Sequence, residues 1–242
     1  DLYGTGEVMG DLIRNGKSIK LWNTDNYSYG KDNGQRLYQS HPWVLGVRED
    51  GTSFGVIADN TWKMEISLGE RITFSSEGPA FRIIVIEKDN PQEVMIELGK
   101  LTGTIQLPPL WSLGFHQCRY SYYPASRVKS LADSMRIKNI PCDVIWMDID
   151  YMQDFRIFTF DSTGFPNPKE TNEYLHKNNF KSVWMIDPGI KAEGGYFVYD
   201  SGEKIDAWIK NSNDSVFVGK VWPGDCVFPD FTQSKVSNWW AG

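Results

Sequence analysis

The chain has 242 residues, of which 40% are hydrophobic and 14% aromatic, and this content is ample for one large or two ordinary globular domains. The formal net charge of −6 and the lack of any run of basic residues argue against nucleic acid or an anionic membrane surface as a partner. No stretch of 18 apolar residues is present, so the sequence predicts no membrane span.

Residues 1–105 carry the signals of β-structure. Four Gly-bounded segments are short, rich in β-branched and aromatic residues, and spaced as the strands of a sandwich are. These segments are "TSFGVIADN", "TWKMEISLG", "RITFSSEG" and "AFRIIVIEK". We therefore expect a β-sandwich domain in this part of the chain.

A short helix and a stiff linker are expected next. The segment "NPQEVMIELGKLTG" predicts a helix that partly buries Val94, Ile96 and Leu98, and "QLPPL" predicts a linker because its two prolines restrict the backbone. The predicted domains are residues 1–105 and residues 106–242.

Strands and helices alternate in the second predicted domain. Residues 111–120, 142–150 and 180–190 predict buried strands. Residues 126–139 repeat apolar side chains at i, i+3, i+4 and i+7, which predicts an amphipathic helix with Ser126 as its N-cap, and "NPKETNEYLHKNN" predicts a helix that opens near a proline. This alternation indicates a parallel sheet covered on both sides, either the start of a (β/α)₈ barrel or a doubly wound sheet. No phosphate-binding glycine motif opens a helix, which weakens a nucleotide-binding interpretation.

Polar side chains follow each predicted strand of this domain. They are His116 and Arg119, then Asp148 and Asp150, then Asp187. An ionised Asp at the end of a buried strand is costly unless it is paired, hydrogen-bonded or facing solvent or a ligand. In a (β/α)₈ barrel such residues surround one pocket at the C-terminal ends of the strands. The alternative is a structural ion pair between Arg119 and one of the two acids of the second strand.

Metal and redox chemistry have little support. The three cysteines, Cys118, Cys142 and Cys226, match no metal-ligand spacing and predict buried free thiols, and the three histidines are scattered. The sequence thus predicts no metal and no cofactor. The ten tryptophans are many for this length, and exposed aromatic rings are surfaces on which sugars stack, although core packing is the ordinary role of any single Trp.

Longer motifs extend these observations. The second predicted domain contains, in order, "LGFHQCRYSY", "DVIWMDIDYM", "FTFDSTGFPNP", "MIDPGI" and "GKVWPGDCVFPDFT", and the first contains "YGTGE", "LWNTDNYSYG", "LYQSHPWVLG" and "SFGVIADN". In order and spacing these motifs resemble glycoside hydrolase family 31, the α-glucosidase and α-xylosidase family. The resemblance covers nearly the whole chain, and it implies a galactose-mutarotase-like β-sandwich followed by the N-terminal part of a (β/α)₈ barrel.

The resemblance implies substrate-binding roles. Asp148 matches a carboxylate that binds sugar hydroxyls in subsite −1, and Ile149 lines the same pocket. Asp25 matches an acid that a sandwich loop sends over the barrel mouth, although on its own it would be read as a turn residue. The aromatic and apolar walls of the pocket are Trp184, Met185 and Trp222. His116, Arg119, Asp150 and Asp187 are expected to support these residues.

The resemblance also implies a retaining mechanism, in which one carboxyl group attacks the sugar and another serves as acid and base. In the family the nucleophile lies in a W-x-D-M-N-E motif on the fourth strand, and the acid/base lies beyond it. Residues 1–242 contain no such motif. We therefore expect no catalytic residue in this chain. Both of its ends resemble cuts within folded sequence, so we expect the remainder of the same enzyme to complete the barrel. The sequence predicts no localisation.

The expected substrate is an α-glucoside oligosaccharide, because "NTDNYSYG" is closer to the family's α-glucosidases than to its α-xylosidases. Two alternatives remain besides an α-xylosidase. A catalytically inactive carbohydrate-binding relative would carry the same residues, and a doubly wound enzyme would instead place a crevice where the strand order reverses.

Overall fold

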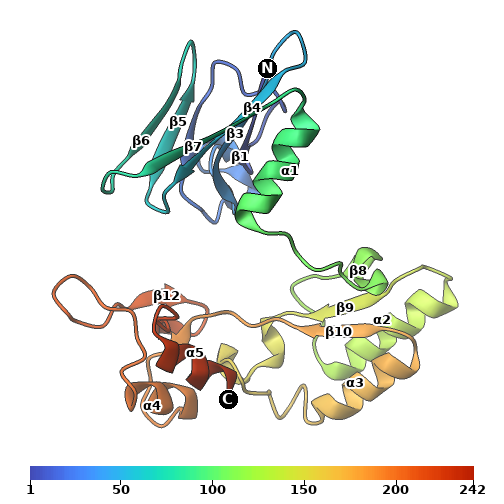
Figure 1. The fold of residues 1–242 in the computed structure, drawn as a ribbon. Coiled ribbons are helices and arrows are strands. Elements are labelled where there is room, and N and C mark those ends of the chain that lie inside the picture. The colour runs from blue at the N-terminus through green and yellow to red at the C-terminus, as the bar shows by residue number, and fades with distance from the viewer. The chain divides into compact units, whose positions relative to one another are not determined.

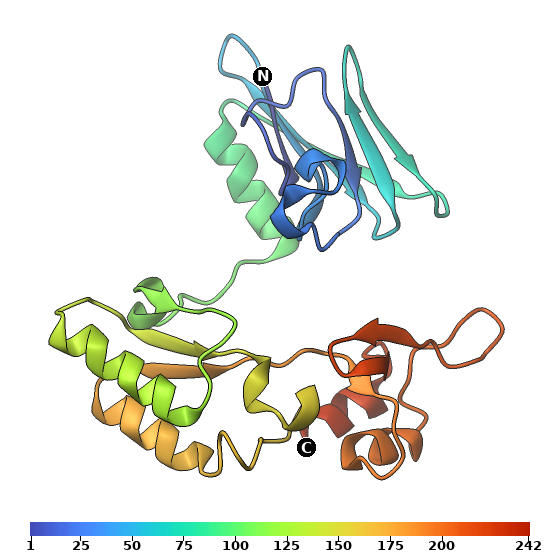
Figure 2. The same ribbon diagram turned by 180° about the vertical axis from the view of Figure 1, so that it is seen from behind.

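The computed structural model describes all 242 residues, which form two compact units (Figures 1 and 2). Unit 1 comprises Asp1–Gln106 and unit 2 comprises Leu107–Gly242. Each unit has its own cluster of buried apolar side chains. None of the helices combines the length and the apolar character that a membrane crossing requires.

Unit 1 contains two antiparallel sheets. One has the order β1 (Leu2–Gly6), β3 (Ser40–Val47), β4 (Ser53–Asp59), β7 (Arg82–Lys88), and the other has the order β2 (Ser18–Leu21), β5 (Met64–Leu68), β6 (Ile72–Ser76). Buried side chains from both sheets pack together, among them Val44 of β3 and Ile66 of β5. The residues of β5 alternate between buried and half-buried, as expected for a strand with one face toward a core. The predicted β-sandwich is therefore confirmed.

The helix α1 (Pro91–Thr102) follows β7. It begins where Asn90 caps it, because the Asn90 side chain accepts a hydrogen bond from Glu93 N at 2.9 Å. Val94 is fully buried, whereas Ile96 is 57% exposed. The expectation that Ile96 is partly buried is wrong. Residues two positions apart on a helix point in directions that differ by about 200°, so Ile96 lies away from the face that holds Val94.

Unit 2 begins with a parallel sheet. Its strands β8 (His116–Gln117), β9 (Val144–Met147) and β10 (Lys181–Trp184) lie in sequence order, with β9 in the middle. This order is that of the first strands of a (β/α)₈ barrel, and it contains no reversal of the kind that a doubly wound sheet needs.

The strands are shorter than predicted. Most of residues 111–120 is not a strand, because Leu110–Leu113 forms the 3₁₀ turn η3 and only two residues pair with β9. Gly114 separates the turn from the strand, and its backbone lies so close to Asp143 that a side chain there would collide with the Asp143 carboxylate. The third strand likewise ends at Trp184, well before residue 190.

The helices α2 (Ala125–Ile137) and α3 (Pro168–Lys177) lie on the same side of this sheet (Figure 1). Asn167 caps α3 by accepting from Glu170 N at 3.1 Å, with Pro168 in its first turn as predicted. The prediction that Ser126 caps α2 is wrong: Pro124 holds the N-cap position without a side-chain bond, and the carbonyl of Gly164 accepts from Ala125 N at 3.0 Å.

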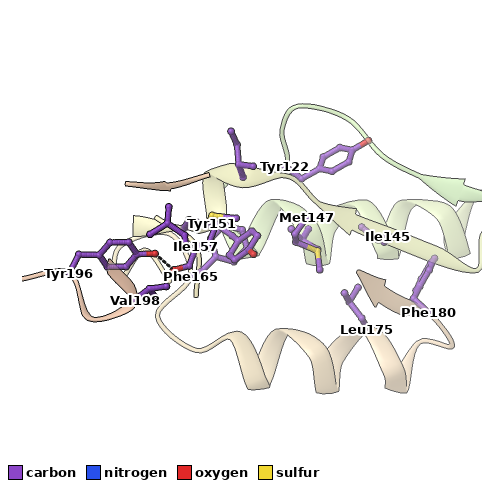
Figure 3. Packing of buried hydrophobic residues seen from close by; sticks show 14 of the residues in the cluster. Tyr122, Ile145, Met147, Tyr151, Ile157, Phe165, Leu175, Phe180, Tyr196 and Val198 are labelled. Atoms are coloured by element: carbon purple, nitrogen blue, oxygen red, sulfur yellow. Dashed lines mark hydrogen bonds between the residues drawn. The ribbon is translucent and has the colours of Figure 1, made fainter. Parts of the chain in front are cut away.

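The sheet presents two different faces. Ile145 and Met147 of β9 belong to an apolar cluster that includes Ala132 of α2. Figure 3 shows them together with Leu175 of α3. Successive strand residues point to opposite faces, so Trp146 and the residues in register with it point away from the helices. We call this second side the helix-free face.

The remainder of unit 2 consists of short elements. They are η4 (Ile149–Tyr151), η5 (Gln153–Phe155), β11 (Ile190–Lys191), α4 (Phe197–Glu203), β12 (Gly219–Val221), β13 (Gly224–Val227) and α5 (Ser234–Ala241), with β11, β13 and β12 forming a small antiparallel sheet. In unit 1, η1 (Tyr27–Tyr29) and η2 (Asp32–Gly34) lie in the connection between β2 and β3. All three cysteines are free, as predicted, and Cys142 and Cys226 are buried; the expectation of a buried thiol is wrong for Cys118, which is exposed.

Candidate functional site

Asp148 stands directly at the C-terminal end of β9. The strand ends at Met147, and Asp148 becomes the N-cap of η4, where its Oδ1 accepts a hydrogen bond from Ile149 N at 2.7 Å. The residue is half-buried and forms no salt bridge. Side chains alternate between the two faces along an extended chain, so Asp148, two residues after Trp146, lies on the same helix-free face. One backbone N–H leaves most of its acceptor capacity free.

Two further strand ends share the surroundings of Asp148. Asp187, which follows β10, is half-buried, and its pKa is raised by burial and then by the nearby negative charge of Asp148. The pKa of the Cys118 thiol, just beyond β8, is raised by burial and by the same charge. Side chains that follow all three strands therefore lie near one another, at the edge where a (β/α)₈ barrel places its pocket.

Asp150 is anchored to the segment that follows β8. The hydroxyl of Ser121 donates to Asp150 Oδ2, and the charge of Asp150, followed by its hydrogen bond, raises the pKa of Tyr120. Tyr120 is 63% exposed, so it offers an aromatic ring at the same edge. Sequence reasoning did not single out Tyr120 or Ser121. The available signal was their position directly after a strand whose end already carried candidate residues.

Arg119 does not pair with either acid. Its guanidinium lies over the ring of Tyr122 at 5.8 Å from the centroid, and no salt bridge joins it to Asp148 or Asp150. The alternative interpretation of these acids as partners in a structural ion pair is therefore wrong.

His116 is held by tryptophans rather than by the acids. Trp146 Nε1 donates to His116 Nδ1 at 3.1 Å, which leaves the proton of the neutral imidazole on Nε2. Trp111 stacks against the ring at a centroid distance of 6.4 Å. The Nε2 atom is buried and has no hydrogen-bond partner. His116 thus contacts β9 through Trp146.

Two expected pocket residues are packed within or against the apolar core of unit 2. Ile149 is 3% exposed within the apolar core of unit 2. Trp184 donates from Nε1 to Asn172 Oδ1 of α3 at 2.9 Å and packs edge-to-face on Tyr151 at 4.9 Å. Met185 follows Trp184 directly, and consecutive side chains of an extended strand point to opposite faces, so Met185 lies on the same side as Asp148. Met185 therefore shares a side with Asp148, whereas Ile149 and Trp184 contribute to apolar packing.

Trp222 lies in the turn between β12 and β13 and is 69% exposed, so a large part of its ring is open to a ligand. It forms no aromatic pair. No group of three or more His, Cys, Asp and Glu side chains in the molecule could hold a metal ion.

Asp25 lies in unit 1, in the connection between β2 and β3. Its carboxylate accepts a hydrogen bond from the hydroxyl of Tyr38 at 2.8 Å, which raises the pKa of Tyr38, and it is otherwise exposed. The loop is organised by its neighbour Asn26, which is 2% exposed and bonds the backbone of Lys31 and Arg36. The turn-forming role therefore belongs to Asn26, and the carboxylate of Asp25 stays available.

Comparison with known proteins gives the same assignment for both units. The family model described as the glycosyl hydrolases family 31 TIM-barrel domain matches residues 105–242, and that of the family's N-terminal galactose mutarotase-like domain matches residues 1–66. Alpha-glucosidase 2 of Bacillus thermoamyloliquefaciens is 40% identical over 98% of this chain and 30% of its own length. The α-glucosidase of Mucor javanicus is 35% identical over 99% of this chain and 28% of its own. The chain thus spans about a third of the length of these curated relatives.

Solved structures agree. The crystal structure of a family 31 α-glucosidase from Bacteroides thetaiotaomicron matches with a TM-score of 0.91 and 56% identity, over 99% of this chain and 41% of that one. A dextranase from Flavobacterium johnsoniae matches with a TM-score of 0.85 and 29% identity, over 99% of this chain and 29% of that one. These matches confirm the expected fold, a mutarotase-like sandwich followed by the start of a (β/α)₈ barrel.

Proposed function

Because the chain belongs to glycoside hydrolase family 31, we propose that the full-length protein containing it removes terminal, non-reducing α-linked glucose from oligosaccharides with retention of configuration. The observation that carries this proposal is the carboxylate of Asp148, which stands at a barrel strand end without a cationic partner and close enough to Asp187 to raise that residue's pKa. Relatives named as α-glucosidases support glucose as the sugar.

Asp148 acts in this proposal as a clamp on sugar hydroxyls. A carboxylate accepts charge-assisted hydrogen bonds, which are stronger than neutral ones, and its negative charge favours a transition state with oxocarbenium character. The family's nucleophile and acid/base belong to motifs that residues 1–242 do not contain. Asp148 is accordingly assigned to binding and not to the covalent step.

Other residues of unit 2 complete the proposed pocket, in which Met185 forms a wall beside Asp148 and Trp222 offers an aromatic face. In unit 1, the carboxylate of Asp25 is proposed as a further substrate-binding group. The members of the supporting set hold Asp148, Met185 and Trp222 in place from behind or from the flanks. This set comprises Ile149, Trp184, His116, Arg119, Asp150 and Asp187. The remainder of the same enzyme is proposed to complete the barrel around an α-glucoside oligosaccharide.

The test uses the full-length protein with Asp148 replaced by Asn or by Ala. Hydrolysis of p-nitrophenyl α-glucoside should lose several orders of magnitude in kcat/KM, because the interaction strengthens in the transition state. The circular dichroism spectrum and the melting temperature should remain close to wild type. Asp214→Asn is the matched control, since the Asp214 side chain is 87% exposed and distant in the sequence from the strand ends.

Each alternative has its own outcome. Near-normal turnover by Asp148→Asn, or its failure to fold, contradicts the assignment of Asp148. Preferential hydrolysis of p-nitrophenyl α-xyloside by the wild type indicates an α-xylosidase. Binding of glucose oligosaccharides without hydrolysis of either substrate indicates a carbohydrate-binding relative.

A further inference from the structure

Unit 1 contains a cleft that none of the proposed roles uses. It has a volume of about 530 Å³, within the range of small-ligand sites. Its walls come from the end of β2, the start of β3 and the connection between β4 and β5. The residues that matter for its chemistry are Trp22, Asn23, Ser40, Asn60, Thr61 and Trp62.

Two tryptophans of this cleft are exposed to an unusual degree. Trp22 is 50% exposed and Trp62 is 58% exposed, whereas Trp43 of the same unit is 9% exposed. Indole rings supply large apolar area, and their exposure leaves that area without a partner. Both rings border one concave site, so a single ligand can contact them together.

Trp62 is held in a fixed position. Asn60 Oδ1 accepts from Trp62 N at 2.9 Å, and Asn60 Nδ2 donates to Ser76 Oγ of β6 at 2.8 Å. Gly78 lies directly against the indole, since a Cβ at that position would come within 2.3 Å of Trp62 Cγ. The ring is therefore supported on one side and open on another. A rigid aromatic surface of this kind binds a ligand with little loss of side-chain entropy.

The polar groups of the cleft define the ligand. The side chains of Asn23, Ser40 and Thr61 have no hydrogen-bond partner in the molecule, and no charged residue lines the cleft. Amide and hydroxyl groups both donate and accept hydrogen bonds. Together with two aromatic faces they suit a neutral molecule that has an apolar C–H face and a rim of hydroxyl groups. A pyranose ring has this chemistry, whereas phosphate, a peptide carboxylate and a divalent cation do not.

We propose that this cleft binds one or two sugar units of an α-glucan chain, with Trp22 and Trp62 as stacking surfaces. The choice of an α-linked glucose chain rests on the proposed function, but the recognition of a neutral sugar rests on the cleft alone.

The experiment measures binding of maltoheptaose to the full-length protein by isothermal titration calorimetry. Saturating 1-deoxynojirimycin, a glucose mimic, is present throughout to occupy a glucose-specific site and prevent hydrolysis. Trp22→Ala and Trp62→Ala should each weaken the remaining binding at least tenfold. Leu12→Ala is the matched control, because Leu12 is 75% exposed in the same unit and does not line the cleft, and it should bind within twofold of wild type.

Two results would overturn the proposal. They are the absence of maltoheptaose binding in the wild type and unchanged binding in both Trp variants. If unchanged binding came with a marked fall in melting temperature, the rings would be structural. Turnover of p-nitrophenyl α-glucoside, measured in parallel and expected to be unchanged in the Trp variants, separates the two hypotheses. Hydrolysis without cleft binding rejects only this inference, and cleft binding without hydrolysis rejects only the proposed function.

Discussion

Replacing Tyr151 by Phe should remove one hydrogen bond, which links the segment after β9 to the end of β10. The Tyr151 hydroxyl donates to the carbonyl of Met185 at 2.8 Å, and Met185 N donates to the carbonyl of Met147 at 3.0 Å. Tyr151 is 4% exposed, and burial raises its pKa to about 12, so it remains a neutral donor under ordinary conditions. The substitution therefore tests a hydrogen bond and not a charge.

The magnitude follows from what Phe preserves and what it deletes. The ring keeps its edge contacts with Trp184 at 4.9 Å and Phe165 at 6.4 Å, and removal of a single oxygen creates almost no cavity. The loss consists of the net hydrogen bond and the desolvation of a carbonyl left without its partner, together about 2 kcal/mol. Tyr151→Ala, which also deletes the ring contacts, should cost about 3–5 kcal/mol.

The assay is urea unfolding of the full-length protein at constant pH, with the transition of the barrel unit followed by tryptophan fluorescence. Tyr27→Phe serves as the control, since Tyr27 is 84% exposed and should change the free energy of unfolding by less than about 0.5 kcal/mol. If Tyr151→Phe shows an equally small change with an unaltered m-value, the hydrogen bond to Met185 does not stabilise the strand ends and the reasoning fails.

Four further substitutions test other parts of the structure by the same unfolding measurement. Arg136→Lys should cost about 1–3 kcal/mol, because the guanidinium bonds three backbone carbonyls near the start of β9 and the end of α3, and an ammonium cannot span them; an unchanged midpoint would contradict this. Asn90→Ala should cost about 1 kcal/mol and Ser126→Ala less than about 0.5 kcal/mol, and the reverse ranking would refute the observed caps. Asp187→Asn should stabilise the protein more near pH 7 than below the unfolded carboxyl pKa of 3.8. Because the pKa of Asp187 is raised in the folded state, wild-type stability falls as pH rises from 3.8 through the folded pKa, and Asn avoids this loss. Equal effects of the substitution at both pH values would reject the prediction.

The order and type of the elements could be predicted from the sequence because each has a local cause. The i, i+3, i+4, i+7 spacing that includes Val128 and Ala132 produced α2, and the polar ends of apolar runs marked Asp148 and Asp187. The N-cap of α2 could not be predicted, since the group that satisfies Ala125 N is a carbonyl 39 residues away in the chain, that of Gly164.

The candidate site was predictable as a set of strand ends but not in the orientation of each side chain. Trp184 and Met185 are adjacent in sequence, and only the register of β10 against β9 tells which of them points toward Asn172 of α3. Register depends on hydrogen bonds between segments far apart in the chain, which periodicity within one segment does not encode. The electrostatic proximity of Asp148 and Asp187 required the fold for the same reason.

The alternation along β9 has a consequence for which substitutions the sheet can accept. Ile145 and Met147 carry the packing against the helices, while Trp146 and Asp148 face the other way. Four consecutive residues thus divide evenly between the face that packs on the helices and the helix-free face. A combinatorial library restricted to Trp146 and Asp148 would therefore vary the helix-free face while the packing of Ile145 and Met147 against α2 and α3 stays in place.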